Sequence, residues 1–498
     1  MKKSSLPEQE KYEVRDIDPN LLELERKKYR NQVKGSAKKK VYSKANKPYP
    51  FVITVKFRFP SDVDAFAKNV GQLLDSDIKE FTYDPLHRKS RKHGFHSSNK
   101  NKRESNRSKD WVGLWKSANM PDFVQTEAKW ECYRVQAIIK NKEDHQIFAR
   151  VVRQYLTVKS KSIYFPKWTP ANLREKKWVS DLPLAEKNPV YPVFIISRGR
   201  AFSRYTAEAL EELQVPYFIV VEPAEFEDYA QSIDETKILV LPYDTDKKNP
   251  TGPGRARNWC WDYAKNILKS KRHWVMDDNI TAFYRLHKNR RIKVGDGAMF
   301  RGCEDFVDRF ANVPVAGLQY RMFCAAKNEY PAFVANTRIY SCLLIDNACK
   351  RRWRGRYNED TILSLDVLSD GDVTIQFNHF LQGKMGTQVL AGGNTDIFYH
   401  NEEMADFAKS TEDRYHSLGT LQKSVYLKQE YPTLTEVVWK FSRVHHSVNY
   451  QPFKQNQMLL KKNPKPVMDL QFRLVDMTQE DIALQQQQIA DENKLSPD

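Results

Sequence analysis

The stretch VYPVFIISRGR, residues 190–200, is the first of four segments that indicate the fold. In it an apolar run ends in a Ser-Arg-Gly-Arg segment. Three later apolar stretches end in the same way, in polar, glycine or proline residues: VPYFIVVEP (215–223), TKILVLPYD (236–244) and HWVMDDNI (273–280). Helix-like segments separate them: YTAEALEELQ (205–214) and GRARNWCWDYAKNILKS (254–270). This alternation predicts an α/β domain with a mostly parallel sheet.

Two adjacent carboxylates, Asp277 and Asp278, follow the last of these apolar stretches directly. Like charges at this spacing raise each other's pKa and destabilise a fold unless a positive charge lies between them. The pair either points into water as an ordinary turn or holds a cation. A hard divalent cation binds oxygen ligands and commonly links carboxylates to substrate phosphates. We therefore predict a metal site at Asp277 and Asp278, with Asn279 as a further candidate ligand.

Two glycine- and arginine-containing segments are candidate nucleotide ligands, because ligands of such sheets bind beyond the carboxyl ends of the strands. A small residue, a glycine and two guanidinium groups can hold phosphates, and a helix N-terminus with arginines favours an anion. The candidates are Ser197, Arg198, Gly199, Arg200, Gly254, Arg255, Arg257 and Asn258. A plain glycine-rich loop is the alternative. Neither segment has the spacing of the common phosphate-binding or dinucleotide-binding glycine motifs, which argues against nucleotide hydrolysis and redox chemistry.

The charge balance of the chain suggests a polyanionic partner. Among 498 residues, 81 Lys and Arg outnumber 63 Asp and Glu, giving a formal net charge of +18. Nucleic acid is the first candidate partner and an anionic membrane surface the second; a basic enzyme whose charge is incidental is the alternative. No apolar run approaches the roughly 18–20 residues of a membrane-spanning helix, and the first residues lack the apolar region of a signal peptide. The six cysteines show no zinc-like spacing, so we expect a cytoplasmic protein and no membrane partner.

Residues 52–85 and 134–166 form an internal repeat, in which Phe66 matches Phe148. Each copy predicts a strand, an amphipathic helix and a short second strand closed by proline. Such a unit cannot bury its apolar face alone, so the two copies should pack together. The repeat resembles a small module that recurs in bacteriophage proteins linked to DNA modification.

The segment between the repeats, residues 86–109, holds nine Lys or Arg and a single acid, Glu104. We expect a loosely ordered loop whose charge suits a phosphate backbone, with an ordinary solvated surface as the alternative. The predicted domains are a basic arm over 1–49, a DNA-binding repeat module over 50–179, an α/β domain over 189–455 and a disordered tail over 465–498.

The α/β segments resemble a known family. GPGRARNWCWDYAKN (252–266) and HWVMDDNI resemble the helix start and the metal motif of nucleotide-sugar glycosyltransferases with the GT-A fold. RGRYNEDTILSLDVL (354–368), KMGTQ…GGNTDIFY (384–399) and VVWKFSRVHHSVNY (437–450) are similar to phage glycosyltransferases encoded beside DNA-base-oxidising dioxygenases, the TET-associated glycosyltransferase family. The resemblance implies sugar transfer from a nucleotide sugar, most commonly a UDP-sugar, to hydroxymethylated pyrimidines such as 5-hydroxymethylcytosine in DNA, with Mn²⁺ or Mg²⁺ bound.

The resemblance also implies roles for individual residues. Asp277 and Asp278 would bind the metal, and His445 or His446 would supply a late metal ligand. Asp360 would take the proton from the acceptor hydroxyl, with Glu359 orienting it; carboxylates favoured at a helix N-terminus are the alternative. Because many relatives have Asp-x-Asp where this chain has Asp-Asp-Asn, the identity of the ligating oxygens stays open.

Further residues are candidate acceptor contacts. Aromatic and basic side chains could stack on or clamp a nucleic acid strand, and the candidates are Trp353, Arg354, Tyr357, Lys384, Thr387, Gly393 and Asn394. The hydroxymethyl group could be reached in the major groove or on a base flipped out of the duplex. Two other functions remain open: a glycosyltransferase acting on a protein, lipid or polysaccharide, and a non-catalytic DNA-binding accessory protein.

Overall fold

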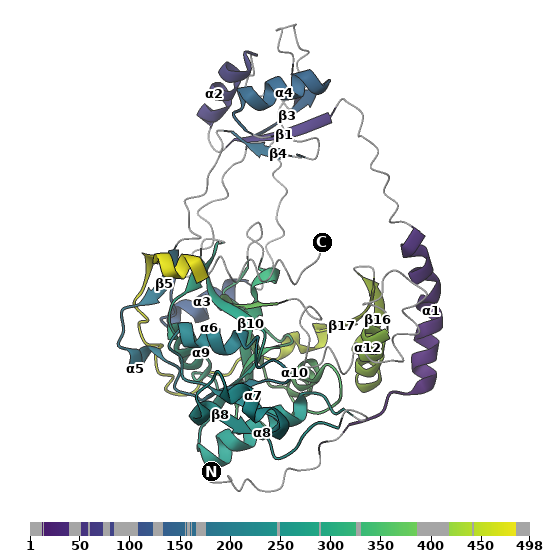
Figure 1. Ribbon diagram of the computed structural model, residues 1–498, viewed down its shortest axis with the longest axis vertical. Coiled ribbons are helices and arrows are strands. Elements are labelled where there is room, and N and C mark those ends of the chain that lie inside the picture. Colours follow the sequence, from purple (N-terminus) through teal and green to yellow (C-terminus); the bar gives the residue numbers. More distant parts are fainter. Residues whose placement is uncertain are drawn as a thin grey trace. The chain divides into compact units, whose positions relative to one another are not determined.

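The computed structural model describes residues 12, 14–38, 51–57, 60–72, 80–83, 108–122, 133–154, 156, 160, 162–165, 176–246, 250–287, 290–324, 330–385, 418–440 and 443–484. The chain divides into two compact units (Figure 1). The larger comprises Met1–Lys40, Arg107–Gln125 and Arg174–Asp498, and the smaller comprises Val41–Asn106 and Thr126–Leu173.

The smaller unit is built from the two repeats. Its elements are β1 (Phe51–Phe57), α2 (Pro60–Val70), β2 (Glu80–Thr82), β3 (Tyr133–Ile139), α4 (Lys142–Val151) and β4 (Ser162–Tyr164). The sheet order is β2-β3-β1-β4. The long strands β1 and β3 are antiparallel, while the short strand of each repeat lies parallel to the long strand of the other. Each repeat therefore completes the sheet of its partner.

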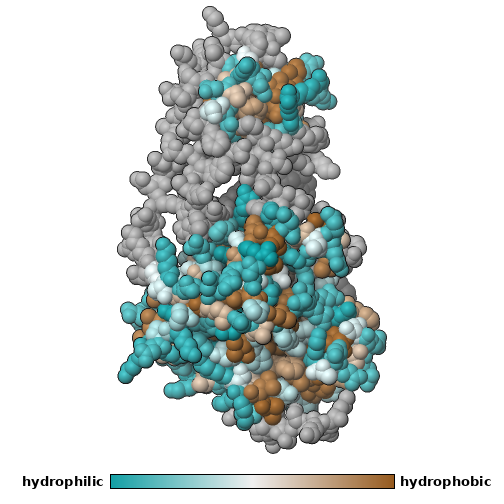
Figure 2. Space-filling view, turned by 90° about the vertical axis from the view of Figure 1, so that its left-hand side faces the viewer, coloured by the Kyte–Doolittle hydropathy of each residue, from teal (hydrophilic) through white to brown (hydrophobic). Residues whose placement is uncertain are grey.

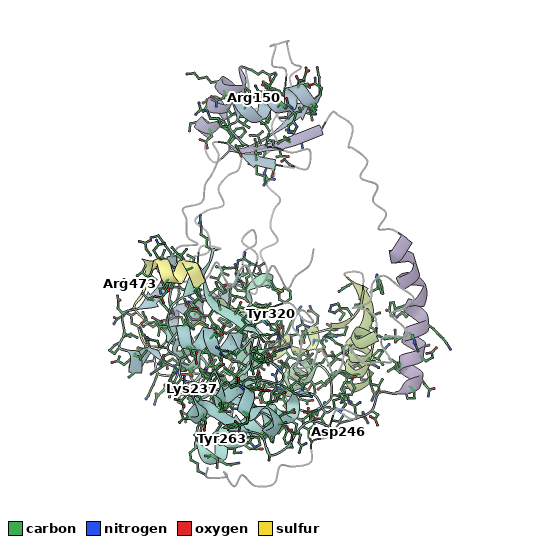
Figure 3. All side chains as sticks on the ribbon, in the orientation of Figure 1. Arg150, Lys237, Asp246, Tyr263, Tyr320 and Arg473 are labelled. Atoms are coloured by element: carbon green, nitrogen blue, oxygen red, sulfur yellow. The ribbon has the colours of Figure 1, made fainter. Side chains whose placement is uncertain are left out.

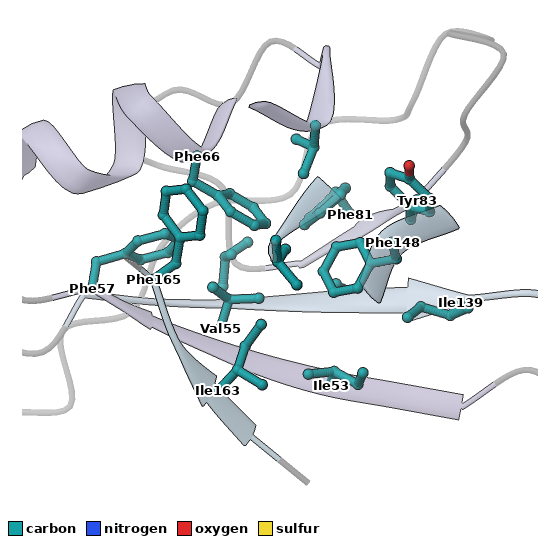
Figure 4. Packing of buried hydrophobic residues seen from close by; sticks show 14 of the residues in the cluster. Ile53, Val55, Phe57, Phe66, Phe81, Tyr83, Ile139, Phe148, Ile163 and Phe165 are labelled. Atoms are coloured by element: carbon teal, nitrogen blue, oxygen red, sulfur yellow. The ribbon is translucent and has the colours of Figure 1, made fainter. Parts of the chain in front are cut away.

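One face of this sheet carries the core of the smaller unit. Ile53, Val55 and Phe57 alternate with outward residues on β1, and their neighbours on β3 alternate likewise, so each strand is buried on one face only. Phe66 on α2 and Phe148 on α4, the matching residues of the two repeats, meet edge to face with ring centroids 6.2 Å apart (Figure 4). The repetition in the sequence thus becomes an approximate two-fold arrangement around shared aromatic packing.

The larger unit contains a 12-stranded sheet with the order β18-β5-β11-β10-β15-β12-β14-β9-β6-β7-β8, in which β13 pairs with β15. Its strands are β5 (Lys176–Ser180), β6 (Val193–Ile196), β7 (Phe218–Val221), β8 (Ile238–Val240), β9 (Arg272–Asp277), β10 (Ile280–His287), β11 (Arg290–Val294), β12 (Val315–Tyr320), β13 (Phe333–Ala335), β14 (Cys342–Asp346), β15 (Thr374–Lys384) and β18 (Phe472–Asp476). A separate hairpin pairs β16 (Thr435–Lys440) with β17 (Arg443–Val448).

Helices complete the larger unit. They are α1 (Pro19–Lys38), α3 (Ser108–Ser117), α5 (Leu184–Lys187), α6 (Tyr205–Glu212), α7 (Phe226–Ala230), α8 (Gly254–Asp262), α9 (Ala298–Val307), α10 (Glu359–Ser369) and α12 (Leu418–Glu430). None of these or the other described helices has the length and apolar character needed to cross a membrane. On the face shown in Figure 2, hydrophilic residues cover much of the described surface and hydrophobic ones form separate patches.

The prediction of a mostly parallel sheet holds for one half only. Strands β9, β6, β7 and β8 are parallel, but β14 lies antiparallel between β9 and β12, and β10 is antiparallel to β11 and β15. The sheet is therefore mixed. Parallel neighbours need a crossover connection, usually a helix, and the helix-like segments between residues 190 and 280 supply such connections for the parallel half alone.

The expected disordered tail is wrong for its described residues, and the described part of the basic arm is a helix that packs on the larger unit. Tyr29 of α1 donates a hydrogen bond of 2.6 Å to the Val437 carbonyl, and apolar residues of α1 pack on α12 and the hairpin. At the other end of the chain, β18 pairs antiparallel with β5, and Leu470 is buried. Both segments carry apolar residues at helix or strand spacing. They also carry many charged residues, and for this reason their composition did not predict that they pack on the rest of the larger unit. The basic insertion between residues 86 and 107 lies outside the described residues.

Candidate active site

The carboxyl edge of the parallel strands brings the predicted acidic pair together with other polar residues. Ile196, which precedes Ser197, lies opposite Asp277 in the sheet, and Met276 lies opposite Cys342, which follows Ser341. The Thr206 hydroxyl on α6 donates to the Asp277 carbonyl at 2.7 Å and accepts from the Ile280 amide at 2.8 Å. The turn that carries the two aspartates is thus fixed by a buried threonine.

Asp277 is held between two cations. Its carboxylate accepts a hydrogen bond of 2.7 Å from Arg257 on α8 and forms an ion pair with Lys384 at the end of β15. Burial opposes ionisation of this carboxyl, but Lys384 and Arg257 outweigh burial and hold its pKa well below the usual range. Asp277 is therefore an anion, and its charge is balanced from within the protein.

Asp278 has a separate set of partners. It pairs with Arg200 and accepts a hydrogen bond of 2.9 Å from the Ser197 hydroxyl, which lies 2.6 Å from the Tyr229 hydroxyl. Burial raises the pKa of Asp278 although Arg200 acts in the opposite direction. The two adjacent aspartates thus tolerate each other because each faces its own cation.

The acids at the start of α10 complete the network. Arg257 contacts Asp360 at 2.5 Å, and the Ser341 amide and Trp353 indole each donate to Asp360 at 3.2 Å. Glu359 lies 3.6 Å from Arg257, and burial together with Asp360 raises its pKa to about 7. One guanidinium therefore contacts three carboxylates, of which Asp360 is held on both oxygens and Glu359 exchanges its proton near neutral pH.

Ser341 contacts both Asp360 and Lys384, and its backbone conformation is unusual. Its φ of 66° is rare for a residue other than glycine and carries strain. The strained conformation lets its amide donate to Asp360 while its hydroxyl lies 2.7 Å from the Lys384 ammonium and 2.5 Å from the Tyr320 hydroxyl. No local pattern in the sequence marks Ser341 or Tyr320, because each precedes or ends an ordinary apolar strand.

Several predicted nucleotide ligands make internal contacts instead. Arg198 pairs with Glu222 at 3.4 Å, and the Gly199 amide donates to Glu225 at 2.8 Å. The Arg255 guanidinium lies 3.5 Å from the Tyr243 ring centroid. Asn258 donates to the Trp353 carbonyl at 2.8 Å, which fixes the loop that leads into α10. From the two segments, Ser197, Arg200 and Arg257 contact the carboxylates of Asp277, Asp278 and Asp360 directly.

The prediction that Trp353 stacks on or clamps a nucleic acid strand is wrong. This side chain is only 1% exposed and packs edge to face on Trp261, so no ring face is free for a base. Arg354 forms ion pairs with Asp366 and Glu430, and Tyr357 packs against Tyr426. The arginine-rich neighbourhood had suggested a surface, whereas these residues anchor α10. Thr387, Gly393 and Asn394 lie outside the described residues.

The predicted metal does not fit the described residues as they are arranged. The oxygens of Asp277 and Asp278 already face Lys384, Arg257, Arg200 and the Ser197 hydroxyl. Asn279 contributes one buried oxygen without a partner, which is a single neutral donor. Across the described ranges, no three His, Cys, Asp or Glu side chains are grouped to hold a metal ion. In this arrangement Arg200, Arg257 and Lys384 balance the charges of the two aspartates.

The late histidines lie on the hairpin. His446 faces Val437 across the two strands and is half-buried, and its two enclosed ring nitrogens have no hydrogen-bond partner among the described residues. Burial, followed by the charges of Lys423 and Arg338, lowers its pKa well below the usual value. His445 adjoins it with a ring centroid distance of 5.8 Å. Neither belongs to a described group of metal-ligating side chains, which leaves the predicted ligand role of both without support.

Tyr12 occupies the space that a ligand was predicted to fill at Gly254. Its hydroxyl donates a hydrogen bond of 2.7 Å to the Gly355 carbonyl, and a Cβ added at Gly254 would lie 2.0 Å from the Tyr12 oxygen. Burial and the nearby Glu359 charge raise the pKa of Tyr12. The glycine thus permits the approach of Tyr12 from the N-terminal segment, a contact that no local pattern predicts.

A double-mutant cycle is expected to show this contact. Gly254→Ala should destabilise the protein by about 1–3 kcal/mol, because the added methyl group would overlap the Tyr12 ring. In a Tyr12→Ala background the same change should instead be neutral or stabilising by roughly 0.5–1 kcal/mol, since alanine favours a helix over glycine. Urea unfolding of the four proteins measures the coupling; equal effects of Gly254→Ala in both backgrounds would rule the contact out.

A cavity of about 750 Å³ lies elsewhere, next to the start of β9, and Lys271, Asp308 and Lys461 are among its lining residues. None of the predicted catalytic or binding residues lines it. The buried ionic network at the carboxyl edge is therefore the stronger candidate for a reaction site.

Comparison with known proteins identifies a family for the part of the chain that carries the ionic network. Residues 191–393 match the family model described as TET-associated glycosyltransferase. No curated protein matches the chain. The chain thus carries a glycosyltransferase-family domain, and the matched range contains the whole ionic network from Ser197 to Lys384. The hairpin with His445 and His446 lies outside the matched range, as does Tyr12.

Proposed function

We propose that the glycosyltransferase-family domain moves a sugar from a nucleotide sugar, with UDP-sugars as the first candidates, to the hydroxymethyl group of a modified pyrimidine in DNA. The family match supports glycosyl transfer and a link to modified DNA, and the net charge of +18 suits a polyanionic acceptor. The observation that carries the proposal is the buried network of four carboxylates and three cations at the carboxyl edge of the parallel strands. Its position supports a GT-A-like arrangement over 189–455.

The three cations suit the leaving group of this reaction. When the bond between the sugar and the diphosphate breaks, negative charge grows on the departing phosphate oxygens. Preorganised positive groups in a site shielded from water stabilise such charge at little reorganisation cost. Arg200, Arg257 and Lys384 are already ordered by their carboxylate partners. We assign to them the role of fixed hydrogen-bond donors to the departing phosphate oxygens, because their carboxylate partners already balance their charges.

Glu359 is the better candidate for the proton acceptor. In the proposed step the acceptor oxygen bonds to the anomeric carbon, the carbon–phosphate-oxygen bond breaks, and the hydroxyl proton passes to a carboxylate. Asp360 already accepts three hydrogen bonds over its two oxygens. Glu359 has a pKa raised to about 7 by burial and by Asp360, and its nearest cation lies 3.6 Å away. We therefore assign proton transfer to Glu359 and its orientation to Arg257 and Asp360, the reverse of the order suggested by the sequence.

The smaller unit has a surface suited to the DNA backbone. On the open face of its sheet, Lys56 lies directly opposite Arg134. Two basic side chains next to each other on a sheet face can contact the phosphates of a nucleic acid strand. This pair supports the assignment of DNA binding to the repeat module.

Mass spectrometry of treated DNA tests the proposed function. Purified protein is incubated with a panel of nucleotide sugars and with DNA containing 5-hydroxymethylcytosine or 5-hydroxymethyluracil, and the DNA is digested to nucleosides. The expected result is a hexose or pentose adduct on one modified base and none on unmodified DNA. Nucleotide-sugar hydrolysis without an adduct would point to another acceptor. DNA binding without hydrolysis would favour a non-catalytic accessory protein.

A further inference from the structure

Three aromatic residues form a continuous surface beside the ionic network, which we call the aromatic wall. Tyr320 ends β12, Phe323 lies in the following short helix Arg321–Phe323, and Tyr340 precedes β14. The Tyr320 ring centroid is 4.3 Å from that of Tyr340 and 5.6 Å from that of Phe323. Figure 3 labels Tyr320 within the larger unit. The Tyr320 and Tyr340 rings meet edge to face and the Phe323 ring is tilted against Tyr320, so the three rings form one packed cluster.

The inner end of the aromatic wall touches the candidate catalytic residues. The Tyr320 hydroxyl lies 2.5 Å from the Ser341 hydroxyl, which in turn contacts Lys384 at 2.7 Å. The Lys384 ammonium lies 5.6 Å from the Tyr320 ring centroid while it pairs with Asp277. A ligand that contacts these rings would therefore lie beside the cations and carboxylates of the site.

The outer end of the aromatic wall reaches solvent. Phe323 is 48% exposed and its neighbour Met322 is 53% exposed. Grouped exposed apolar side chains of this size commonly mark a binding surface. Positive charge flanks them, because the Arg338 guanidinium lies 4.8 Å from the Tyr340 ring centroid and the Arg321 guanidinium lies 4.5 Å from that of Tyr284. Aromatic faces interleaved with arginines are suited to nucleotides, whose bases stack and whose phosphates are anionic.

We propose that the aromatic wall binds the acceptor pyrimidine as an unstacked base, either flipped out of a duplex or presented by a single strand. Within a duplex both faces of a base are covered by its neighbours and only its edges are accessible in the grooves. An aromatic side chain can cover a base face only after the base has left the stack. This inference rests on the proposed function and adds how the acceptor is presented, with the exposed Phe323 as its stacking residue.

The first test compares wild type with Phe323→Ala. Using single-stranded DNA that contains one 5-hydroxymethylpyrimidine, the variant should raise the KM for DNA by about 5- to 100-fold, the range expected for loss of one stacking contact. Nucleotide-sugar hydrolysis without DNA should be unchanged, because Phe323 lies outside the ionic network. Phe323→Trp retains an aromatic ring and should have the KM of wild type. Leu459→Ala truncates a 57% exposed side chain elsewhere and should leave the KM for DNA unchanged. An unchanged KM in Phe323→Ala would overturn the inference.

A second test needs no variant. Unstacking costs least when a base is mismatched or unpaired, so wild type should modify a duplex with a mismatch opposite the target base faster than a fully paired duplex. An enzyme that reads the group in the major groove should modify the paired duplex at least as fast, and that result would also overturn the inference. Absence of any adduct with wild type would instead contradict the proposed function, so the two failures are distinguishable.

Discussion

Replacement of Lys384 by methionine is expected to lower the rate of sugar transfer by about 10²–10³-fold, the usual effect of losing one preorganised electrostatic group. Burial works against the charge of Lys384, but Asp277 and Tyr320 hold its pKa above the usual value, so the ammonium is charged at every working pH. Methionine keeps most of the side-chain volume and removes the charge. The rate is measured as adduct formed on DNA at saturating donor and acceptor.

Lys293→Met is the matched control for this change. Lys293 is also a buried lysine on the same sheet, 4% exposed and paired with Glu212 at 2.8 Å, but it lies on β11 outside the ionic network. Both variants should lose stability, because each leaves a carboxylate with one cation fewer. Only Lys384→Met should lose activity per folded molecule. Equal transfer by the two folded variants would remove Lys384 from the reaction.

Replacement of Glu359 by glutamine is expected to lower transfer by about 10²–10⁴-fold, the range for loss of a general base. Glutamine retains the shape but cannot accept the proton. The assignment also fixes the pH dependence of the wild type. Because the pKa of Glu359 is raised to about 7, the reactive carboxylate is scarce below this pH, and the rate should rise through neutral pH to a plateau on the alkaline side.

The pH profile has a control of its own in Glu304→Gln. Burial likewise raises the pKa of Glu304, to about 8, although it accepts hydrogen bonds from the Val190 amide and the Trp274 indole. Glu304 lies on α9, away from the ionic network. This variant should retain the rise in activity near neutral pH, whereas the residual activity of Glu359→Gln should not show it. A flat wild-type profile across this range would exclude Glu359 as the base.

The sequence predicted the parts of the site that depend on local order along the chain. Asp277 and Asp278 follow a strand that alternates with helices, so their place at a carboxyl edge followed from the pattern alone. The same reasoning placed Ser197 and Arg200 at that edge. The pairing of Asp277 with Lys384 could not be inferred, because β10, which follows the pair, and β15, which ends at Lys384, are distant in sequence and meet antiparallel.

The site residues that the sequence did not predict make contacts that no local sequence pattern indicates. Ser341 matters because of its backbone conformation, and Tyr12 because an N-terminal segment returns to the loop at Gly254. Trp353 was misread because the arginines around it suggested a surface, whereas Trp261 and Arg257 enclose it. The metal was inferred from adjacent carboxylates, and the structure supplies lysine and arginine side chains as their partners instead.

The measurement that tests this account most directly is sugar transfer by metal-free protein. The protein and its substrates are freed of divalent ions with EDTA, and adduct formation on hydroxymethylated DNA is followed with and without added Mn²⁺ or Mg²⁺. If Arg200, Arg257 and Lys384 hold the departing diphosphate without a metal ion, the rate should be the same in both conditions. A rate that appears only when the divalent ion is restored would contradict the account and return Asp277 and Asp278 to the role of metal ligands.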